Sequence, residues 1–121
     1  MPAMPTILVV EDDHDVRDAF VQVLQSDGYE AVPAGDGEDA LTQLQSGLDP
    51  CLILLDLMMP RMNGWEFIEH HRHLASRRPI VVVSAYGSPE QLGSEDVIAY
   101  MRKPVDIEAL LALIARHCRK Q

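Results

Sequence analysis

The chain has 121 residues, of which 47% are hydrophobic and 24% are charged, a size and composition typical of one globular domain and not of a disordered or fibrous protein. No apolar run approaches the roughly 20 residues that a membrane-spanning helix needs, and the first residues lack the basic and apolar regions of a secretory signal. The net charge of −9 argues against generic nucleic-acid binding, which needs clustered Lys and Arg, so we expect a cytoplasmic protein that binds neither nucleic acid nor membrane.

Five apolar segments predict β-strands. In chain order they are Thr6–Val10, Glu30–Ala34, residues 51–55, Ile80–Ser84 and residues 98–102. The first, third and fourth are nearly continuous runs of Val, Ile and Leu, which is typical of parallel strands covered on both faces. The second segment has a weaker apolar pattern.

Stretches with helical periodicity lie between the strands. The first helix has one apolar face, formed by Val16, Phe20, Val23 and Leu24. The last helix has a longer apolar stripe, formed by Ile107, Leu110, Leu111, Ile114 and Cys118. Residues suited to cap helix N-termini are Asp36, Asn63 and Asp106. Residues suited to end helices are the pairs Asp27-Gly28 and Ser46-Gly47.

The alternation of strand and helix predicts the fold class. Strand and helix alternate five times, so we expect an α/β protein, a doubly wound three-layer sandwich with helices on both faces of a parallel sheet. The fourth helix is the weak element, because only Ser88 to Val97 separate two strands there and Gly93 interrupts the stretch. We expect that helix to be short or irregular.

The two cysteines are predicted to be unpaired. Cys51 opens an apolar strand, Cys118 lies on the apolar stripe of the last helix, and the two are far apart in the sequence without a CxxC spacing. Buried, reduced thiols are the interpretation that suits a cytoplasmic protein.

Polar side chains gather at the predicted C-terminal ends of the strands. They are Glu11, Asp12, Asp13, Asp56, Ser84 and Lys103. In an open parallel sheet these ends meet at one edge, where ligands bind. Several close carboxylates repel one another unless a cation lies among them, and Mg²⁺ is a hard cation that prefers oxygen ligands. A carboxylate is also a nucleophile for phosphoryl groups, whose charge Lys103 and the Ser84 hydroxyl would offset.

The chain resembles a two-component response-regulator receiver domain over essentially its whole length. The motifs that carry the resemblance are Val9-Val10-Glu11-Asp12-Asp13, Leu55-Asp56-Leu57-Met58-Met59-Pro60, Val83-Ser84-Ala85 and Arg102-Lys103-Pro104. The resemblance implies a flavodoxin-like (βα)5 fold with strand order 2-1-3-4-5. Residues 1–121 would form one receiver domain, with no output domain in the chain.

The resemblance also assigns roles at the acidic edge. Asp56 would be the phosphoacceptor. Asp12 would bind Mg²⁺ (or Mn²⁺) directly, and Glu11 would do so largely through water. Asp56 and the Met58 carbonyl would complete the metal ligands. Asp13 is better explained as a helix-capping acid, and Glu11 and Asp12 have the same alternative if they are considered alone.

Further roles follow for the later motifs. Ser84 would be the Ser/Thr switch and Lys103 the lysine that contacts the phosphoryl group. Tyr100 occupies the place of the rotating aromatic, although a static aromatic at the core edge explains it equally well. Met58 and Tyr86 would flank the path of attacking water and slow hydrolysis. The segment from Ser84 to Lys103 is about three residues shorter than is usual in the family, and coupling from Ser84 to Tyr100 would pass through this shortened segment.

The resemblance implies a function in two-component phosphorelay signal transduction. A histidine kinase or a histidine phosphotransfer protein would donate the phosphoryl group, and a downstream protein or a homodimer would read the change. The chain would phosphorylate and dephosphorylate itself without being an enzyme for a separate substrate. One alternative is a pseudo-receiver that signals by contact without phosphate. Another is a small phosphatase that uses an aspartyl phosphate. Met58 argues against it, because such enzymes typically carry a second Asp at that position, two residues after the nucleophile.

Three histidines offer a competing metal site, which we do not favour. His70, His71 and His73 lie on the predicted third helix, but no further ligand is evident. His71 occupies a position that faces the sheet, where an apolar residue is usual. We expect it to be a packed residue whose polar atoms are satisfied by a hydrogen bond.

Overall fold

The computed structural model describes residues 4–85 and 94–118, which form a five-stranded parallel sheet with helices on both faces. The strands are β1 Thr6–Val10, β2 Glu30–Ala34, β3 Leu52–Leu55, β4 Ile80–Ser84 and β5 Val97–Arg102. Their spatial order is β2-β1-β3-β4-β5, and every neighbouring pair is parallel. The predicted fold class and strand order are confirmed.

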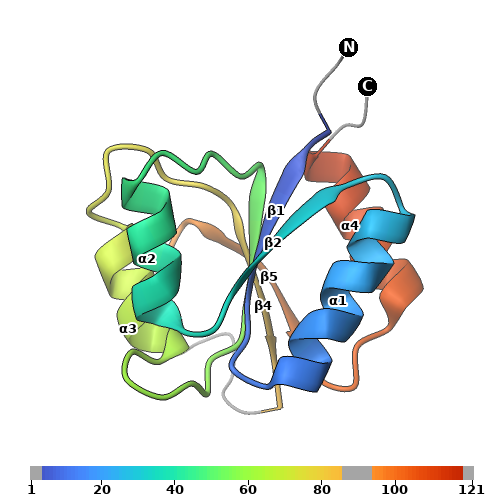
Figure 1. Ribbon diagram of the computed structural model, residues 1–121, viewed down its shortest axis with the longest axis horizontal. Coiled ribbons are helices and arrows are strands. Elements are labelled where there is room, and N and C mark those ends of the chain that lie inside the picture. The colour runs from blue at the N-terminus through green and yellow to red at the C-terminus, as the bar shows by residue number, and fades with distance from the viewer. Residues whose placement is uncertain (1–3, 86–93, 119–121) are drawn as a thin grey trace.

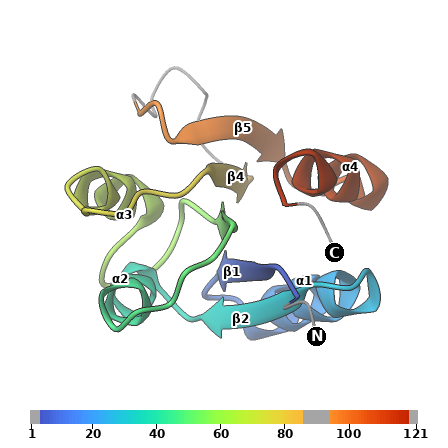
Figure 2. The same cartoon turned by 90° about the horizontal axis from the view of Figure 1, so that it is seen from above.

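In the described part of the chain, four helices cover the sheet in two layers (Figures 1 and 2). They are α1 His14–Ser26, α2 Gly37–Gln45, α3 Gly64–His71 and α4 Ile107–His117. Helices α1 and α4 lie on one face, and α2 and α3 lie on the other, as Figure 2 shows. Within the described part of the chain, no helix has the length and apolar character needed to cross a membrane.

The burial of the strands follows their place in the sheet. Strand β4 and strand β3 are buried throughout, and β1 is buried from its second residue on, as continuous apolar runs require. The edge strand β2 contains buried, partly buried and exposed residues, and the edge strand β5 contains only partly buried and exposed ones. This partial exposure explains the weaker apolar pattern of β2.

The helix boundaries agree with the capping signals. The side chains of Asp13, Asp36, Asn63 and Asp106 each accept a hydrogen bond from a backbone amide in the first turn of their helix. Asp13 is therefore a helix cap, as expected. Gly28 and Gly47 have φ values of 90° and 107°, which suit glycine at the ends of α1 and α2.

The expected fourth helix lies mostly outside the described residues, which resume at Ser94. Residues 94–96 form a turn, and β5 begins at Val97, one residue before the predicted start. The described part of this stretch contains no helix.

The prediction of two unpaired cysteines is wrong, because Cys51 and Cys118 form a disulfide. Their Cα atoms are 5.7 Å apart, although 67 residues separate them in the sequence. Cys51 directly precedes β3 and Cys118 follows α4, and both of these ends lie at the N-terminal edge of the sheet. A parallel α/β fold returns every helix C-terminus to this edge, so spacing along the chain says little about the distance between them.

His71 is a buried, hydrogen-bonded residue, as expected. Its side chain is fully buried against Phe67, and its Nε2 accepts a hydrogen bond of 3.0 Å from the backbone amide of Arg78. Its Nδ1 lies 3.3 Å from Oδ2 of Asp96 at the start of β5. His71 thus joins the end of α3 to the segments that enter β4 and β5.

Candidate functional site

The C-terminal edge of the sheet brings three carboxylates together. Glu11 and Asp12 follow β1, and Asp56 follows β3, which is the neighbour of β1. The amide of Asp56 donates a 3.0 Å hydrogen bond to the Val10 carbonyl, so the ends of the two strands are in register. One carboxylate oxygen from each acid lies within 4.8 Å of the other two. Asp12 is exposed, whereas Glu11 and Asp56 are buried, so the cluster opens to solvent on one side.

Lys103 adds a cation to this cluster from the end of β5. Its Nζ lies 2.8 Å from Oε1 of Glu11 and 3.6 Å from Oδ2 of Asp56. Burial alone would lower the pKa of Lys103, but the hydrogen bond and charge of Glu11, together with the charge of Asp56, raise it above its usual value. Lys103 therefore stays protonated and faces both acids.

Glu11 is the most perturbed group in the site. It is 2% exposed, and its Oε2 has no hydrogen-bond partner among the described residues. Burial and the neighbouring Asp56 raise the pKa of Glu11 to about 8, although Lys103 acts in the opposite direction. A buried carboxylate oxygen without a partner needs an added positive charge or a proton.

The donor set fits a hard divalent cation. Three carboxylates at one edge, one of them with an unpartnered buried oxygen, provide excess negative charge that a single lysine does not balance. Oxygen ligands with an open, solvent-facing side suit Mg²⁺, which keeps several of its waters.

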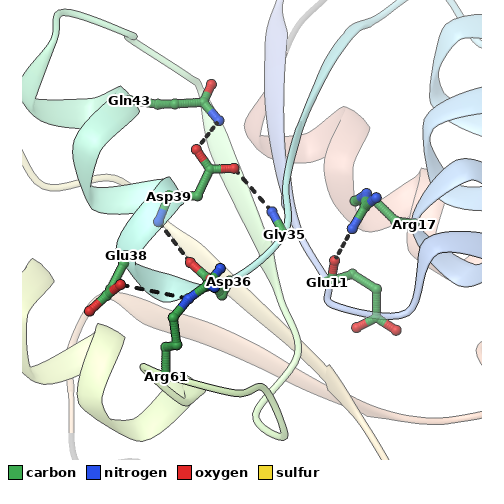
Figure 3. Close-up of polar contacts among 8 residues, drawn as sticks. All are labelled: Glu11, Arg17, Gly35, Asp36, Glu38, Asp39, Gln43 and Arg61. Atoms are coloured by element: carbon green, nitrogen blue, oxygen red, sulfur yellow. Dashed lines mark hydrogen bonds and ion pairs between the residues drawn. The ribbon is translucent and has the colours of Figure 1, made fainter.

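The loop that carries Glu11 is held by two further contacts. The amide of Glu11 donates to the Ala34 carbonyl at 3.0 Å, and Nη1 of Arg17 donates to the Glu11 carbonyl at 3.0 Å (Figure 3). The role of Arg17 could not be predicted from the sequence. Its position one turn into α1 after the acidic residues was the only available signal.

Ser84 ends β4 and Tyr100 lies within β5, the two strands that follow β3 in the sheet. Ser84 is fully buried at the end of β4, and its carbonyl accepts a 3.1 Å hydrogen bond from the amide of Lys103. Tyr100 pairs with Val82 and is partly buried against the core on the α2 and α3 side. Residues two apart on a strand face the same side, so Ser84 and Tyr100 share a face of the sheet. Their roles as switch residues stay predictions.

Met58 lies two residues beyond Asp56, with its side chain at the surface and 48% exposed. Its amide donates a 3.4 Å hydrogen bond to Oδ1 of Asp56. Its carbonyl as a metal ligand, and its side chain as a brake on hydrolysis, stay predictions. Tyr86 lies outside the described residues.

Comparison with known proteins gives the family. The model of the response regulator receiver domain matches residues 7–115. The chain belongs to the response-regulator receiver family. This receiver chain is therefore related to the response regulators of two-component signalling, as the motifs of the sequence indicate.

Curated relatives of the receiver chain are longer proteins. It is 38% identical over 118 residues to YrkP of Bacillus subtilis, described as an uncharacterized transcriptional regulatory protein, covering 94% of this chain and 49% of that one. It is 32% identical over 123 residues to the transcriptional regulatory protein CpxR of Escherichia coli, covering 97% and 50%. The chain spans about half the length of these relatives.

Two solved structures of similar proteins are matched over almost their whole length. The chemotaxis protein CheY4 of Vibrio cholerae has a TM-score of 0.85 and 32% identity, covering 95% of this chain and 99% of that one. The response regulator TrrA of Thermotoga maritima, solved in complex with Mg²⁺-BeF, has a TM-score of 0.84 and 31% identity, covering 93% and 98%.

Proposed function

We propose that this receiver accepts a phosphoryl group on Asp56 with the help of Mg²⁺ (or Mn²⁺). The observation that carries the proposal is the cluster at the sheet edge. Asp56 lies among Glu11 and Asp12, with their oxygens within 4.8 Å, while Lys103 lies 3.6 Å from its Oδ2. Asp56 is 8% exposed, so its carboxylate meets solvent only through the open side of the cluster.

The metal would be held by Glu11, Asp12 and Asp56, with the Met58 carbonyl as a further ligand. When bound, Mg²⁺ neutralises charge on the site and on phosphoryl oxygens, which lowers the barrier to attack by a carboxylate. The unpartnered Oε2 of Glu11 and the exposed carboxylate of Asp12 support this ligand set.

The residues of the chain then perform the transfer. A carboxylate oxygen of Asp56 attacks phosphorus and forms the P–O bond while the bond to the imidazole nitrogen of a phosphohistidine donor breaks, and the electron pair leaves with that nitrogen. The charged Nζ of Lys103 offsets negative charge on the phosphoryl oxygens, and the Ser84 hydroxyl donates to one of them. Hydrolysis of the aspartyl phosphate returns the free carboxylate.

The phosphoryl group would shift a two-state equilibrium around Ser84 and Tyr100. A histidine kinase or histidine phosphotransfer protein is the donor in this proposal, and a downstream protein or a second copy of the chain is the partner that reads the change. In this proposal the protein is cytoplasmic and turns over no separate substrate, although a disulfide such as Cys51–Cys118 is rare in that compartment.

Two alternatives are less well supported. A pseudo-receiver would signal without phosphate, but the complete set of three acids and a lysine at the sheet edge does not support that interpretation. A phosphatase that uses an aspartyl phosphate typically has a second acid where this chain has Met58.

Incubation with a small phosphodonor such as phosphoramidate and Mg²⁺ tests the proposal. The protein should gain the mass of one phosphoryl group, which acid or hydroxylamine removes, and Asp56→Ala should gain none. Asp49→Ala is a matched control, since Asp49 is 74% exposed and precedes β3 at the opposite edge of the sheet. Equal incorporation into Asp56→Ala would overturn the assignment.

A further inference from the structure

Asp36 is a buried acid with two partners from different parts of the chain. It is 1% exposed and caps α2, and its Oδ1 accepts a 2.8 Å hydrogen bond from the amide of Asp39. Its Oδ2 forms an ion pair with Nη2 of Arg61, which lies in the loop between β3 and α3 (Figure 3). The amide of Asp39 and the guanidinium of Arg61 outweigh the effect of burial, so the pKa of Asp36 is below its usual value. Asp36 is therefore an anion with both oxygens engaged.

Arg61 has a backbone conformation that does not suit its side chain. Its φ is 62°, and no other non-glycine residue of the described chain has a positive φ. Glycine would adopt this conformation without steric cost, whereas an L side chain is strained there. The contacts that arginine gains and glycine would lose are the ion pair with buried Asp36 and the longer one with exposed Glu38.

The neighbouring residues reinforce this contact. The amide of Gly37 donates a 3.3 Å hydrogen bond to the Met62 carbonyl. A Cβ on Gly37 would lie 2.9 Å from the Met62 carbonyl oxygen, which shows how closely the loop approaches the start of α2. Two consecutive residues of the β3–α3 loop are thus attached to two consecutive residues at the start of α2.

This attachment joins the β3–α3 loop, which supplies Asp56, to the connection between β2 and α2. The β3–α3 loop begins at Asp56 and includes Met58. On the other side, Ala34 at the end of β2 accepts the hydrogen bond from Glu11, two residues before Asp36. The two ends of the β3–α3 loop are joined directly, because the amide of Gly64 donates a 2.8 Å hydrogen bond to the Leu57 carbonyl. Between Leu57 and Gly64, the described polar contacts with the start of α2 come from Arg61 and Met62, while the side chains of Met59 and Met62 pack against the core.

We propose that Arg61 and Asp36 are positioning residues, which hold the β3–α3 loop in the shape that Mg²⁺ binding requires. This inference rests on the proposed function, in which Asp56 and the Met58 carbonyl are metal ligands. Neither Arg61 nor Asp36 touches the metal or the phosphoryl group. They act through the backbone of the loop, as outer residues of metal sites do when they orient the ligands.

Two substitutions separate this role from a general structural one. Arg61→Gly removes the ion pair and also the backbone strain, so the chain should still fold. Asp36→Asn removes the charge but keeps an oxygen that caps α2. Glu38→Gln is the matched control, because Glu38 is 60% exposed at the same helix start and its Oε2 is 3.7 Å from Arg61 Nε.

Calorimetric Mg²⁺ titration and phosphorylation rates over a range of Mg²⁺ concentrations test the inference. We expect the Mg²⁺ Kd of Arg61→Gly and of Asp36→Asn each to rise about tenfold. The double variant should show no further rise, because both substitutions remove the same ion pair. The phosphorylation rate at saturating Mg²⁺ should be unchanged, and Glu38→Gln should resemble the unsubstituted protein.

The results distinguish a failure of the positioning role from a failure of the proposed phosphoacceptor function. If the unsubstituted protein binds Mg²⁺ and both variants bind it equally well, the positioning role is wrong and the proposed function stands. Weaker binding accompanied by loss of the folded circular dichroism signal would mean a structural role only and would also overturn the inference. Absence of Mg²⁺ binding in the unsubstituted protein would overturn both proposals.

Discussion

Reduction of the disulfide between Cys51 and Cys118 should lower the free energy of unfolding substantially. The bond closes a loop across 67 residues of sequence, which includes β3, β4 and β5. In the loop-entropy description, a closure of this length removes about 15 cal/mol/K from the unfolded chain, or about 4 kcal/mol at 25 °C. Cys118 is 2% exposed, and a reduced thiol packs there as a small hydrophobic group, so reduction should leave the core intact.

Urea unfolding with and without dithiothreitol measures this effect. With an m value of about 2 kcal/mol/M, a loss of about 4 kcal/mol lowers the midpoint by about 2 M. The fluorescence of Trp65, the single tryptophan, and far-ultraviolet circular dichroism provide two independent probes. The double variant Cys51→Ala/Cys118→Ala is the control, and its midpoint should not respond to the reductant.

Alkylation of the unreduced, denatured protein, followed by mass measurement, decides whether the bond exists. No modified cysteine should be found before reduction, and two should be found after it. Two modified cysteines before reduction, together with a midpoint that dithiothreitol does not change, would refute the reasoning.

Three further predictions concern pH and hydrolysis. Because the pKa of Glu11 is raised to about 8, Mg²⁺ binding below that pH should release a proton from Glu11. The apparent Mg²⁺ affinity should therefore rise with pH up to about 8 and then level off. Calorimetry in buffers of different ionisation enthalpy measures the proton release, and its absence would contradict the assignment of Glu11 as a metal ligand. Burial lowers the pKa of His71, although Asp96 opposes this effect. The unfolded chain therefore binds the proton more readily, so the free energy of unfolding should be highest above the ordinary pKa of 6.5 and should fall as the pH decreases below it. His71→Phe should remove that pH dependence and cost about 1–3 kcal/mol by leaving the Arg78 amide unpaired, and urea midpoints at several pH values check both effects. Met58→Asn and Tyr86→Glu should each speed phosphate release from the phosphorylated protein, and no acceleration in either would count against a role in slowing hydrolysis.

The parts of the fold that were predictable depend on local chemistry. The continuous apolar runs of β1, β3 and β4 reflect burial on both faces, and the caps at Asp36, Asn63 and Asp106 need only the residues of one helical turn. The cluster of Glu11, Asp12 and Asp56 was also predictable, because the ends of neighbouring parallel strands meet at one edge.

The contacts that were missed depend on segments far apart in the sequence. Cys51 and Cys118 meet because a strand start and a helix end return to the same edge of the sheet. Asp36 was recognised as a cap, but its ion pair with Arg61 spans 25 residues and has no local signal. The strained φ of Arg61 was likewise invisible, since its neighbours Pro60 and Asn63-Gly64 indicate only a turn.

Identification of the phosphorylated residue tests the central proposal most directly. An aspartyl phosphate is an acyl phosphate, which borohydride reduces to homoserine with loss of phosphate. After phosphorylation with phosphoramidate and Mg²⁺, peptide sequencing by mass spectrometry should find homoserine at position 56, and omission of Mg²⁺ or the phosphodonor should abolish it. Homoserine at another aspartate, or at none in a protein that has gained phosphate, would contradict the assignment of Asp56 as the phosphoacceptor.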